Sequence, residues 1–169
     1  TITESIGFRH FEFIENGPFQ LNGERLLLRG THRHEDHAGV GAAMTEEQME
    51  AEMKLIKEMG VNFIRLGHYQ QSDIILRLCD QLGILVWEEI PWCRGGLGGE
   101  KYQAQARRML TNMITQHRNH PSVILWGLGN ENDWPNDFST FEQSAIRAFM
   151  KELNDLSHQL DPYDFHPQM

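Results

Sequence analysis

The chain has 169 residues, 40% of them hydrophobic and 23% charged, which is the composition of one globular domain and not of a disordered segment. Its formal net charge is -9 and its Lys and Arg residues are scattered, which excludes a nucleic-acid partner because phosphate binding requires a basic footprint. No apolar run is long enough to cross a bilayer, and no signal peptide precedes the first pattern, so we expect no membrane partner and the localisation stays open. Because the chain lacks an initiator Met, we expect it to begin inside a longer polypeptide.

The N-terminal residues predict strands. Residues 8–14 alternate in hydrophobicity, and residues 19–28 predict a hairpin that turns at Asn22-Gly23, the dipeptide that best suits a two-residue hairpin loop. The second arm, Leu26-Leu27-Leu28, is continuously apolar, so we expect a strand that is buried on both faces. It leads directly into a polar cluster at residues 31–37.

Helices and strands alternate in the rest of the chain. Thr45 and Gln48 predict a capping box at the start of a helix that ends at Gly60. Three further strands and helices follow, with strands expected over residues 61–66, 84–87 and 123–128, and helices over residues 72–82, 100–117 and 139–160. Cys79 lies in a helical pattern and Cys93 in a loop, so we expect two free thiols. Four strand–helix units predict a parallel sheet covered by helices.

Polar side chains gather where each predicted strand ends. In chain order these are His32, His34, Glu35 and Asp36, then His68, then Glu88 and Glu89, then Asn130 and Glu131. In a (β/α) barrel the C-terminal rim carries the catalytic residues, which several strands contribute. No Gly-rich phosphate-binding turn follows the first strand, which argues against a dinucleotide-binding sheet. The sequence therefore predicts an α/β fold, namely the first four units of a TIM-type (β/α) barrel (a half-barrel), preceded by a short β-hairpin.

The stretch from Trp126 to Asn132 is the most specific of these strand ends. A buried run that ends in Asn130-Glu131 sets a carboxyl group at the barrel mouth beside an amide. Glycoside cleavage requires a carboxyl group that donates a proton and a neighbour that binds the hydroxyl next to the reacting carbon. The same residues also fit a helix N-cap with an acidic first turn, and this stretch alone does not separate the two interpretations.

The combination of stretches resembles glycoside hydrolase family 2, which comprises β-galactosidases, β-glucuronidases and β-mannosidases. The matching stretches follow the family's order and spacing, and are residues 19–24, 28–36, 62–69, 78–86, 118–126 and 129–131. The resemblance implies a retaining hydrolase of terminal β-glycosides, most closely a β-galactosidase. It also implies that residues 1–16 are the tail of a preceding β-sandwich domain or an N-terminal strand, and that residues 17–169 form the first half of the catalytic barrel.

The resemblance also implies a role for each matched polar residue. Glu131 is similar to the family's general acid/base, and Asn130 to the amide that holds the sugar's 2-hydroxyl. Arg65 resembles the arginine that orients the nucleophilic glutamate. The remaining members of the expected sugar-binding set are His34, His68, Glu89 and Asp36.

Three departures from the family pattern limit these expectations. Gln70 follows His-Tyr where the family usually has Pro, so the rim is shaped differently. Residues 90–94 lack the Glu-x-His that holds magnesium in some β-galactosidases, so we expect no metal and no cofactor. The family's nucleophile lies on the seventh strand, whereas this chain ends after the fourth unit. We therefore expect little hydrolytic activity from the chain alone, and a missing half-barrel in cis or a second copy as its partner at the exposed sheet edges.

Two other functions remain open. His32-x-His34 resembles the metal pair of the amidohydrolases, although that class typically adds a Lys at the fourth strand, where this chain has Asn130 and Glu131. The chain also fits a non-catalytic half-barrel that binds carbohydrate or acts as a scaffold. Bound zinc would favour the first alternative, and a bound sugar without turnover would favour the second.

Overall fold

The computed structural model describes residues 1, 3, 6–134 and 142–162 of the chain. The strands of this described part are β1 (Phe11–Phe13), β2 (Phe19–Leu21), β3 (Glu24–Arg25), β4 (Gly30–Arg33), β5 (Phe63–Leu66), β6 (Leu85–Glu89) and β7 (Val123–Gly127). Its helices are α1 (Glu46–Glu58), α2 (Asp73–Leu82), α3 (Glu100–His117) and α4 (Gln143–Leu160).

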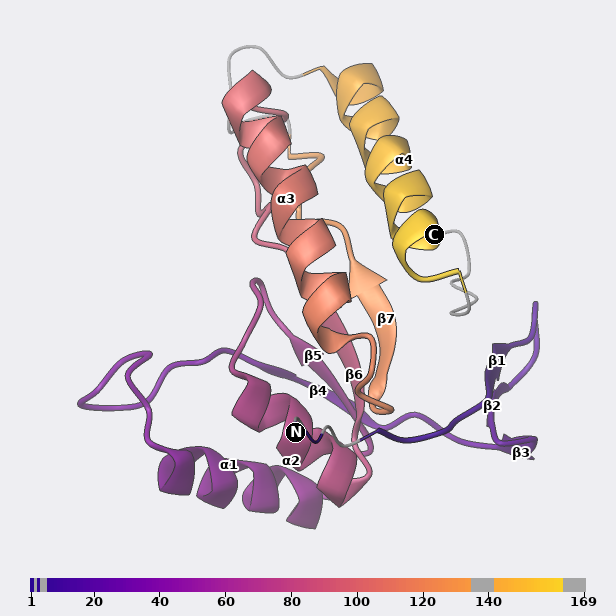
Figure 1. The fold of residues 1–169 in the computed structure, drawn as a ribbon, viewed down its shortest axis with the longest axis vertical. Helices are drawn as coiled ribbons and strands as arrows, with labels where there is room; N and C mark the ends of the chain where they lie inside the picture. Colours follow the sequence, from indigo (N-terminus) through magenta and orange to yellow (C-terminus); the bar gives the residue numbers. More distant parts are fainter. Residues whose placement is uncertain (2, 4–5, 135–141, 163–169) are drawn as a thin grey trace.

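The central feature is a parallel sheet in which β4, β5, β6 and β7 neighbour one another in chain order. A helix connects each strand to the next, so the predicted strand–helix alternation is confirmed (Figure 1). A sequential order without reversal is that of a barrel segment, because a doubly wound sheet reverses its strand order at a switch point. All four strands therefore present their C-terminal ends at the same edge.

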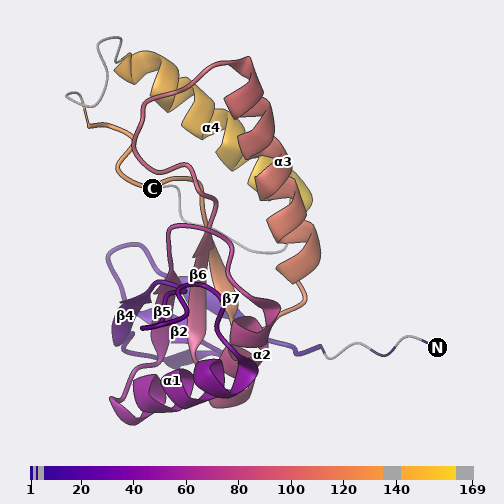
Figure 2. The same cartoon turned by 90° about the vertical axis from the view of Figure 1, so that its left-hand side faces the viewer.

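Helices cover one face of this sheet. They pack in pairs, α1 against α2 and α3 against α4 (Figure 1, Figure 2). The core beneath them takes alternate residues of the strands, including Ile64, Leu66 and Val86, which are fully buried. The indole of Trp126 in β7 donates to the carboxylate of Asp161 at 3.1 Å, which ties the end of α4 to the sheet. None of the helices described here is long and apolar enough to span a membrane.

The opposite face of the sheet divides into an apolar half and a polar half. Near the N-terminal ends of the strands, Leu85, Ile124 and Phe11 form a second buried cluster. The antiparallel sheet of β1, β2 and β3 packs on this cluster, and its β2–β3 hairpin turns at Asn22-Gly23 as predicted. Toward the C-terminal ends of the strands, the same face carries polar side chains. We call this half of the sheet the open face.

Local sequence signals set the helix ends. The Thr45 hydroxyl accepts from the Gln48 N–H while the Gln48 side chain accepts from the Thr45 N–H, which confirms the capping box. Ser72 caps α2, and Gly83 ends it at φ 64°, a backbone conformation that glycine adopts without a steric penalty. The expected start of the last helix near Ser139 lies outside the described residues.

Two expectations about strand boundaries were wrong. The first parallel strand is Gly30–Arg33 and not the apolar run before it, because Gly30–Arg33 is the stretch that pairs with β5. Leu27 in that run is 64% exposed. Glu88 and Glu89 lie within β6 and not after it, because the pairing with β7 continues to Glu89. Cys79 and Cys93 are free thiols, as expected.

Candidate active site

Glu89 is the centre of a hydrogen-bonded group on the open face. Successive side chains of a strand point to opposite faces, so Glu88 faces the helices while Glu89 faces the open side. The buried Glu89 carboxylate accepts from Arg65 of β5, whose Nε and a terminal nitrogen lie 2.9 and 3.1 Å from its two oxygens. It also bonds to Nδ1 of His68, the residue that follows the Gly after β5. Because a carboxylate only accepts, Nδ1 of His68 donates this bond.

Arg65 extends this group to the end of the next strand. Its guanidinium donates to Oδ1 of Asn130 at 2.8 Å and lies over the Trp87 ring, 4.5 Å from the ring centroid. The amide nitrogen of Asn130 points the other way, 3.3 Å from the Cys93 sulfur. The backbone of Asn130 pairs with the loop after β6 through both its N–H and its carbonyl. The orientation of the Asn130 amide is therefore fixed from two sides.

Two glycines make room for this group. A Cβ on Gly67 would lie 2.8 Å from a Glu89 oxygen and 2.5 Å from Cε1 of His32. A Cβ on Gly127, at the end of β7, would overlap both Glu89 and the indole nitrogen of Trp87. Side chains at these positions would force the acidic centre apart, so the sequence needs glycine at both.

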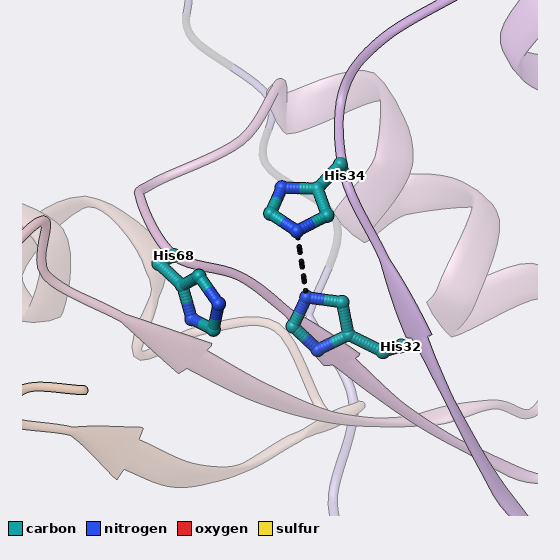
Figure 3. Close-up of side chains that lie close together, drawn as sticks. All are labelled: His32, His34 and His68. Carbon is teal, nitrogen blue, oxygen red and sulfur yellow. Dashed lines mark hydrogen bonds between the residues drawn. The ribbon is translucent and has the colours of Figure 1, made fainter. Parts of the chain in front are cut away.

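Three histidines meet beside Glu89 (Figure 3). His32 lies opposite Arg65 in the β4–β5 register, His34 follows two residues later, and His68 comes from the next strand end. Their ring centroids are 4.8 to 5.3 Å apart, and the Nε2 atoms of His32 and His34 are 3.2 Å apart. Partial burial, followed by the neighbouring imidazoles of His34 and His68, lowers the pKa of His32 below its ordinary value. We had expected His34 and His68 in the sugar-binding set but not His32, although its i,i+2 spacing to His34 places both on one face of an extended chain.

Glu131 follows Asn130 and differs from Glu89 in its surroundings. Its side chain is 47% exposed, and its carboxylate lies 3.9 Å from Nε of Arg94, whose guanidinium stacks over Trp134. Glu131 also has a φ of 51°, in the left-handed region that non-glycine residues seldom occupy. Such a conformation costs on the order of 1 kcal/mol and occurs preferentially at functional sites. Glu131 thus presents a half-exposed carboxyl group from a left-handed backbone conformation.

The other polar residues at the strand ends play different parts. Asp36 is exposed in the loop after β4, and no described contact joins it to Glu89 or to the histidines. Glu35 accepts from the backbone N–H of Ser72 at 2.9 Å and so helps to cap α2. Glu88 faces away from the site and bonds to Nδ1 of His117 at 2.8 Å. Burial raises the pKa of Glu88, an effect that the hydrogen bond from His117 opposes.

Gln70, which stands where a Pro was expected, contributes to the helix-covered side. Its amide nitrogen donates to the Gln116 side chain at 2.9 Å and lies 3.3 Å from Nε2 of His117. The departure from the expected pattern therefore connects the loop after β5 to the end of α3. Neither of these two contacts involves Glu89.

Comparison with known proteins identifies the family. A family model described as glycosyl hydrolases family 2, TIM barrel domain, matches residues 13–162. The chain belongs to glycosyl hydrolase family 2. The resemblance inferred from the sequence is thereby confirmed, and the parallel sheet is part of a family 2 barrel domain.

Several family 2 relatives carry names that specify a sugar. The apo structure of Bacteroides uniformis β-glucuronidase 3 is 82% identical, with a TM-score of 0.91 over 93% of this chain and 20% of that chain. Bacteroides uniformis β-glucuronidase 2, covalently bound to cyclophellitol-6-carboxylate aziridine, is 37% identical, with a TM-score of 0.83 over 93% of this chain and 20% of that chain. A β-galactosidase of Thermoanaerobacterium thermosulfurigenes is 39% identical over 92% of this chain and 20% of its own length.

The three relatives are much longer than this chain, and their names agree on the class of enzyme but not on the sugar. The chain spans about a fifth of the length of each. All three are named as β-glycosidases, so a glycosidase of family 2 is supported. The preference for β-galactosides that the sequence indicated is not confirmed, because the relative of highest identity given above is a β-glucuronidase.

Proposed function

We propose that this chain forms the acid/base-bearing part of the catalytic barrel of a retaining β-glycosidase that hydrolyses terminal β-glucuronides. The observation that carries the proposal is the hydrogen-bonded group of Glu89, Arg65 and Asn130, which lies directly before Glu131 at the C-terminal edge of a family 2 sheet. The choice of glucuronide rests on the 82% identity to a β-glucuronidase.

The roles follow from the chemistry of retaining hydrolysis. The Glu131 carboxyl group donates its proton to the leaving oxygen while a second carboxylate attacks the anomeric carbon, and Glu131 then takes a proton from the water that releases the sugar. Glu131 is exposed and so accessible to the leaving group. Asn130, held by Arg65, offers its amide nitrogen to the 2-hydroxyl. His34 and His68 supply further ring nitrogens for sugar hydroxyls, and Glu89 holds His68 in place. Asp36 is the peripheral member of this set.

The second carboxylate has to come from outside these four strand–helix units. In a retaining enzyme the two carboxyl groups lie roughly 5–5.5 Å apart across the sugar. Glu89 is unsuited to attack, because Arg65 and His68 occupy both of its oxygens and it is fully buried. The covalent adduct of the 37% identical relative is in keeping with a mechanism that passes through a covalent intermediate. We therefore expect the 169-residue chain alone to show no turnover.

A chimera tests this proposal. The matched fifth of Bacteroides uniformis β-glucuronidase 3 is replaced by this chain, which the 82% identity makes compatible with the remaining barrel. We expect the chimera to hydrolyse 4-nitrophenyl β-D-glucuronide with retention, and Glu131→Gln to lower kcat/KM by about 10²–10⁴-fold. For an aryl glucuronide with a much more acidic leaving group, Glu131→Gln should lower kcat/KM by a smaller factor, because the departure of that group needs less proton donation. Unchanged kcat/KM in Glu131→Gln, or robust turnover by the isolated chain, would contradict the proposal.

A β-galactoside is the second candidate substrate, favoured by the 39% identical β-galactosidase. The two sugars differ at C6, where a glucuronide carries a carboxylate and a galactoside carries a hydroxymethyl group, and at the configuration of C4. The ratio of kcat/KM for the matched 4-nitrophenyl glycosides in the same chimera decides between them. A ratio in favour of the galactoside would move the proposal to that substrate.

A further inference from the structure

We propose that His32, His34 and His68 form a binding site for one divalent transition-metal ion of the zinc class on the open face of the parallel sheet. The three imidazoles converge from the ends of two neighbouring strands, β4 and β5, as Figure 3 shows. The site shares His34 and His68 with the sugar subsite of the proposed function, but metal binding itself does not depend on that function.

The distances between ring nitrogens suit a common ligand. Two imidazole nitrogens that bind one tetrahedral zinc at 2.0–2.1 Å lie about 3.3 Å from each other. Nε2 of His32 and Nε2 of His34 are 3.2 Å apart in a hydrogen bond in which one ring donates to the other, and this separation already matches that of two ligands of one ion. One ring nitrogen of each of the three histidines lies within 4.8 Å of the others. His68 thus needs only a small ring movement to complete a three-nitrogen set.

Glu89 prepares His68 for this role. Zinc-binding histidines commonly donate their second ring N–H to a carboxylate, which fixes the tautomer and raises the basicity of the ligating nitrogen. Nδ1 of His68 donates to the Glu89 carboxylate, so the lone pair of the neutral ring resides on Nε2. Glu89 is itself fully buried and held by two bonds from Arg65. Glu89 therefore stands to His68 as a carboxylate stands to a zinc-binding histidine, bonded to one ring nitrogen while the other is available to the metal ion.

The local charge and the donor type indicate which ion fits. The positive charge of Arg65 is matched by the carboxylate of Glu89, so the pair places no net charge beside the histidines. Three imidazoles without a carboxylate ligand favour Zn²⁺, Co²⁺, Ni²⁺ or Cu²⁺ over Mg²⁺ and Ca²⁺, which prefer oxygen ligands. Three protein ligands also leave a fourth position for water or a ligand oxygen. Under the proposed function, an ion here would occupy the ring nitrogens that bind sugar hydroxyls and so act as a competitive inhibitor.

The test is metal binding by the 169-residue chain without an affinity tag. Isothermal titration with Zn²⁺ should give one site per chain, and Co²⁺ should give the visible d–d absorption of a tetrahedral site with nitrogen ligands. His34→Ala removes an exposed ligand and should weaken Zn²⁺ binding at least tenfold and abolish the cobalt spectrum. His37→Ala is the matched control, because His37 is exposed in the same loop but lies outside the cluster, and it should bind both ions unchanged.

A second substitution guards against a fold defect. His34→Asn keeps a polar side chain at the exposed position, so circular dichroism should match the parent chain while Zn²⁺ affinity still falls tenfold or more. The proposal is overturned if the parent chain binds no Zn²⁺ stoichiometrically, or if both His34 variants bind it as tightly as the His37→Ala control. Neither result depends on sugar hydrolysis. An inactive chimera with an intact metal site would refute the proposed function alone.

Discussion

On the helix-covered face of the parallel sheet, Glu88 bonds to His117 of α3, and both side chains are buried. On the open face, its neighbour Glu89 is equally buried, but its partners Arg65 and His68 keep about a quarter of their side-chain surface exposed, 24% and 25%. We call the Glu88–His117 pair closed, because both ring nitrogens of His117 contact side chains within the fold, Nδ1 the Glu88 carboxylate and Nε2 the Gln70 amide. We call the Glu89 group open, because the buried carboxylate orients Arg65 and His68, whose side chains still contact solvent.

This comparison separates structural from functional carboxylates in one strand. A closed pair contributes by holding α3 to β6, so its loss should appear in the free energy of unfolding. An open group contributes by presenting oriented nitrogen atoms, so its loss should appear mainly in ligand affinity. The predictions below test this division from the largest expected effect to the smallest.

Glu88→Ala should have the largest effect on stability. It leaves the buried Nδ1 of His117 without its hydrogen-bond partner and opens a cavity in place of a fully buried side chain, which together cost about 3–5 kcal/mol. Urea denaturation of the chain measures this loss as a lower midpoint. Glu88→Gln, which keeps the shape and an acceptor for His117, is the control and should lose clearly less. A loss below 1 kcal/mol in Glu88→Ala would show that the pair is not what holds α3 to β6.

Gly67→Ala should disturb the open face by crowding. The added Cβ meets the His32 ring and a Glu89 oxygen, and such overpacking costs about 1–3 kcal/mol. The same variant should weaken Zn²⁺ binding, since the His32 ring has to move. Gly99→Ala, where a Cβ meets nothing within 4 Å, provides the control for both measurements. Equal behaviour of the two alanine variants would argue against the close packing around Glu89.

Glu89→Gln should separate affinity from stability. Arg65 and His68 can be solvated once the charge is lost, so we expect a loss of about 1–3 kcal/mol in unfolding free energy, less than for Glu88→Ala. Zn²⁺ affinity should fall about 10–100-fold, because the carboxylate that orients His68 is gone. Titration calorimetry and urea denaturation on the same preparation give both numbers. If stability falls while Zn²⁺ affinity stays constant, Glu89 belongs with Glu88 as a structural residue.

His120 provides the smallest effect and a pH dependence on the helix-covered face. Its hydrogen bond to Asp80 raises its pKa, and Asp73 adds to this. A raised folded-state pKa stabilises the fold below the unfolded value of about 6.5 and loses that contribution as pH rises through the folded value. His120→Gln should therefore cost about 1 kcal/mol at pH 5.5 and much less at pH 8.5. Thermal melts at both pH values measure the difference, and a cost that is independent of pH would exclude the charged form of His120.

Sequence patterns predicted the helices and strands better than they predicted which face of the sheet each side chain occupies. The capping box at Thr45, the cap at Ser72 and the stop at Gly83 are local signals, because each depends on atoms within a few residues. The polar strand ends were also predictable, since parallel strands share one edge. Periodicity alone did not decide whether Glu88 or Glu89 faces the site, because a shift of one residue in the strand boundary exchanges the two faces, and only the family resemblance indicated Glu89.

The meeting of three histidines depended on information that a single sequence does not carry. The i,i+2 spacing of His32 and His34 indicates a common face, but His68 reaches them only through the β4–β5 register. The apolar run Leu26–Leu28 was misleading for a related reason. It joins the hairpin to the sheet and packs in part on the second cluster, so its hydrophobicity reflects long-range packing and not pairing.

The apolar cluster beside the open face, near the N-terminal ends of the strands, determines how a bound ligand is oriented. Phe11, Leu85 and Ile124 are buried there, and the sheet of β1, β2 and β3 covers them, so the histidines, Arg65 and Glu89 lie on the other side of this cluster, toward the C-terminal ends of the strands. A ligand would place its most polar end among the histidines and extend outward past the rim. Under the proposed function, a terminal sugar is therefore bound in the same way whatever it is attached to, from a small phenol to a long polysaccharide.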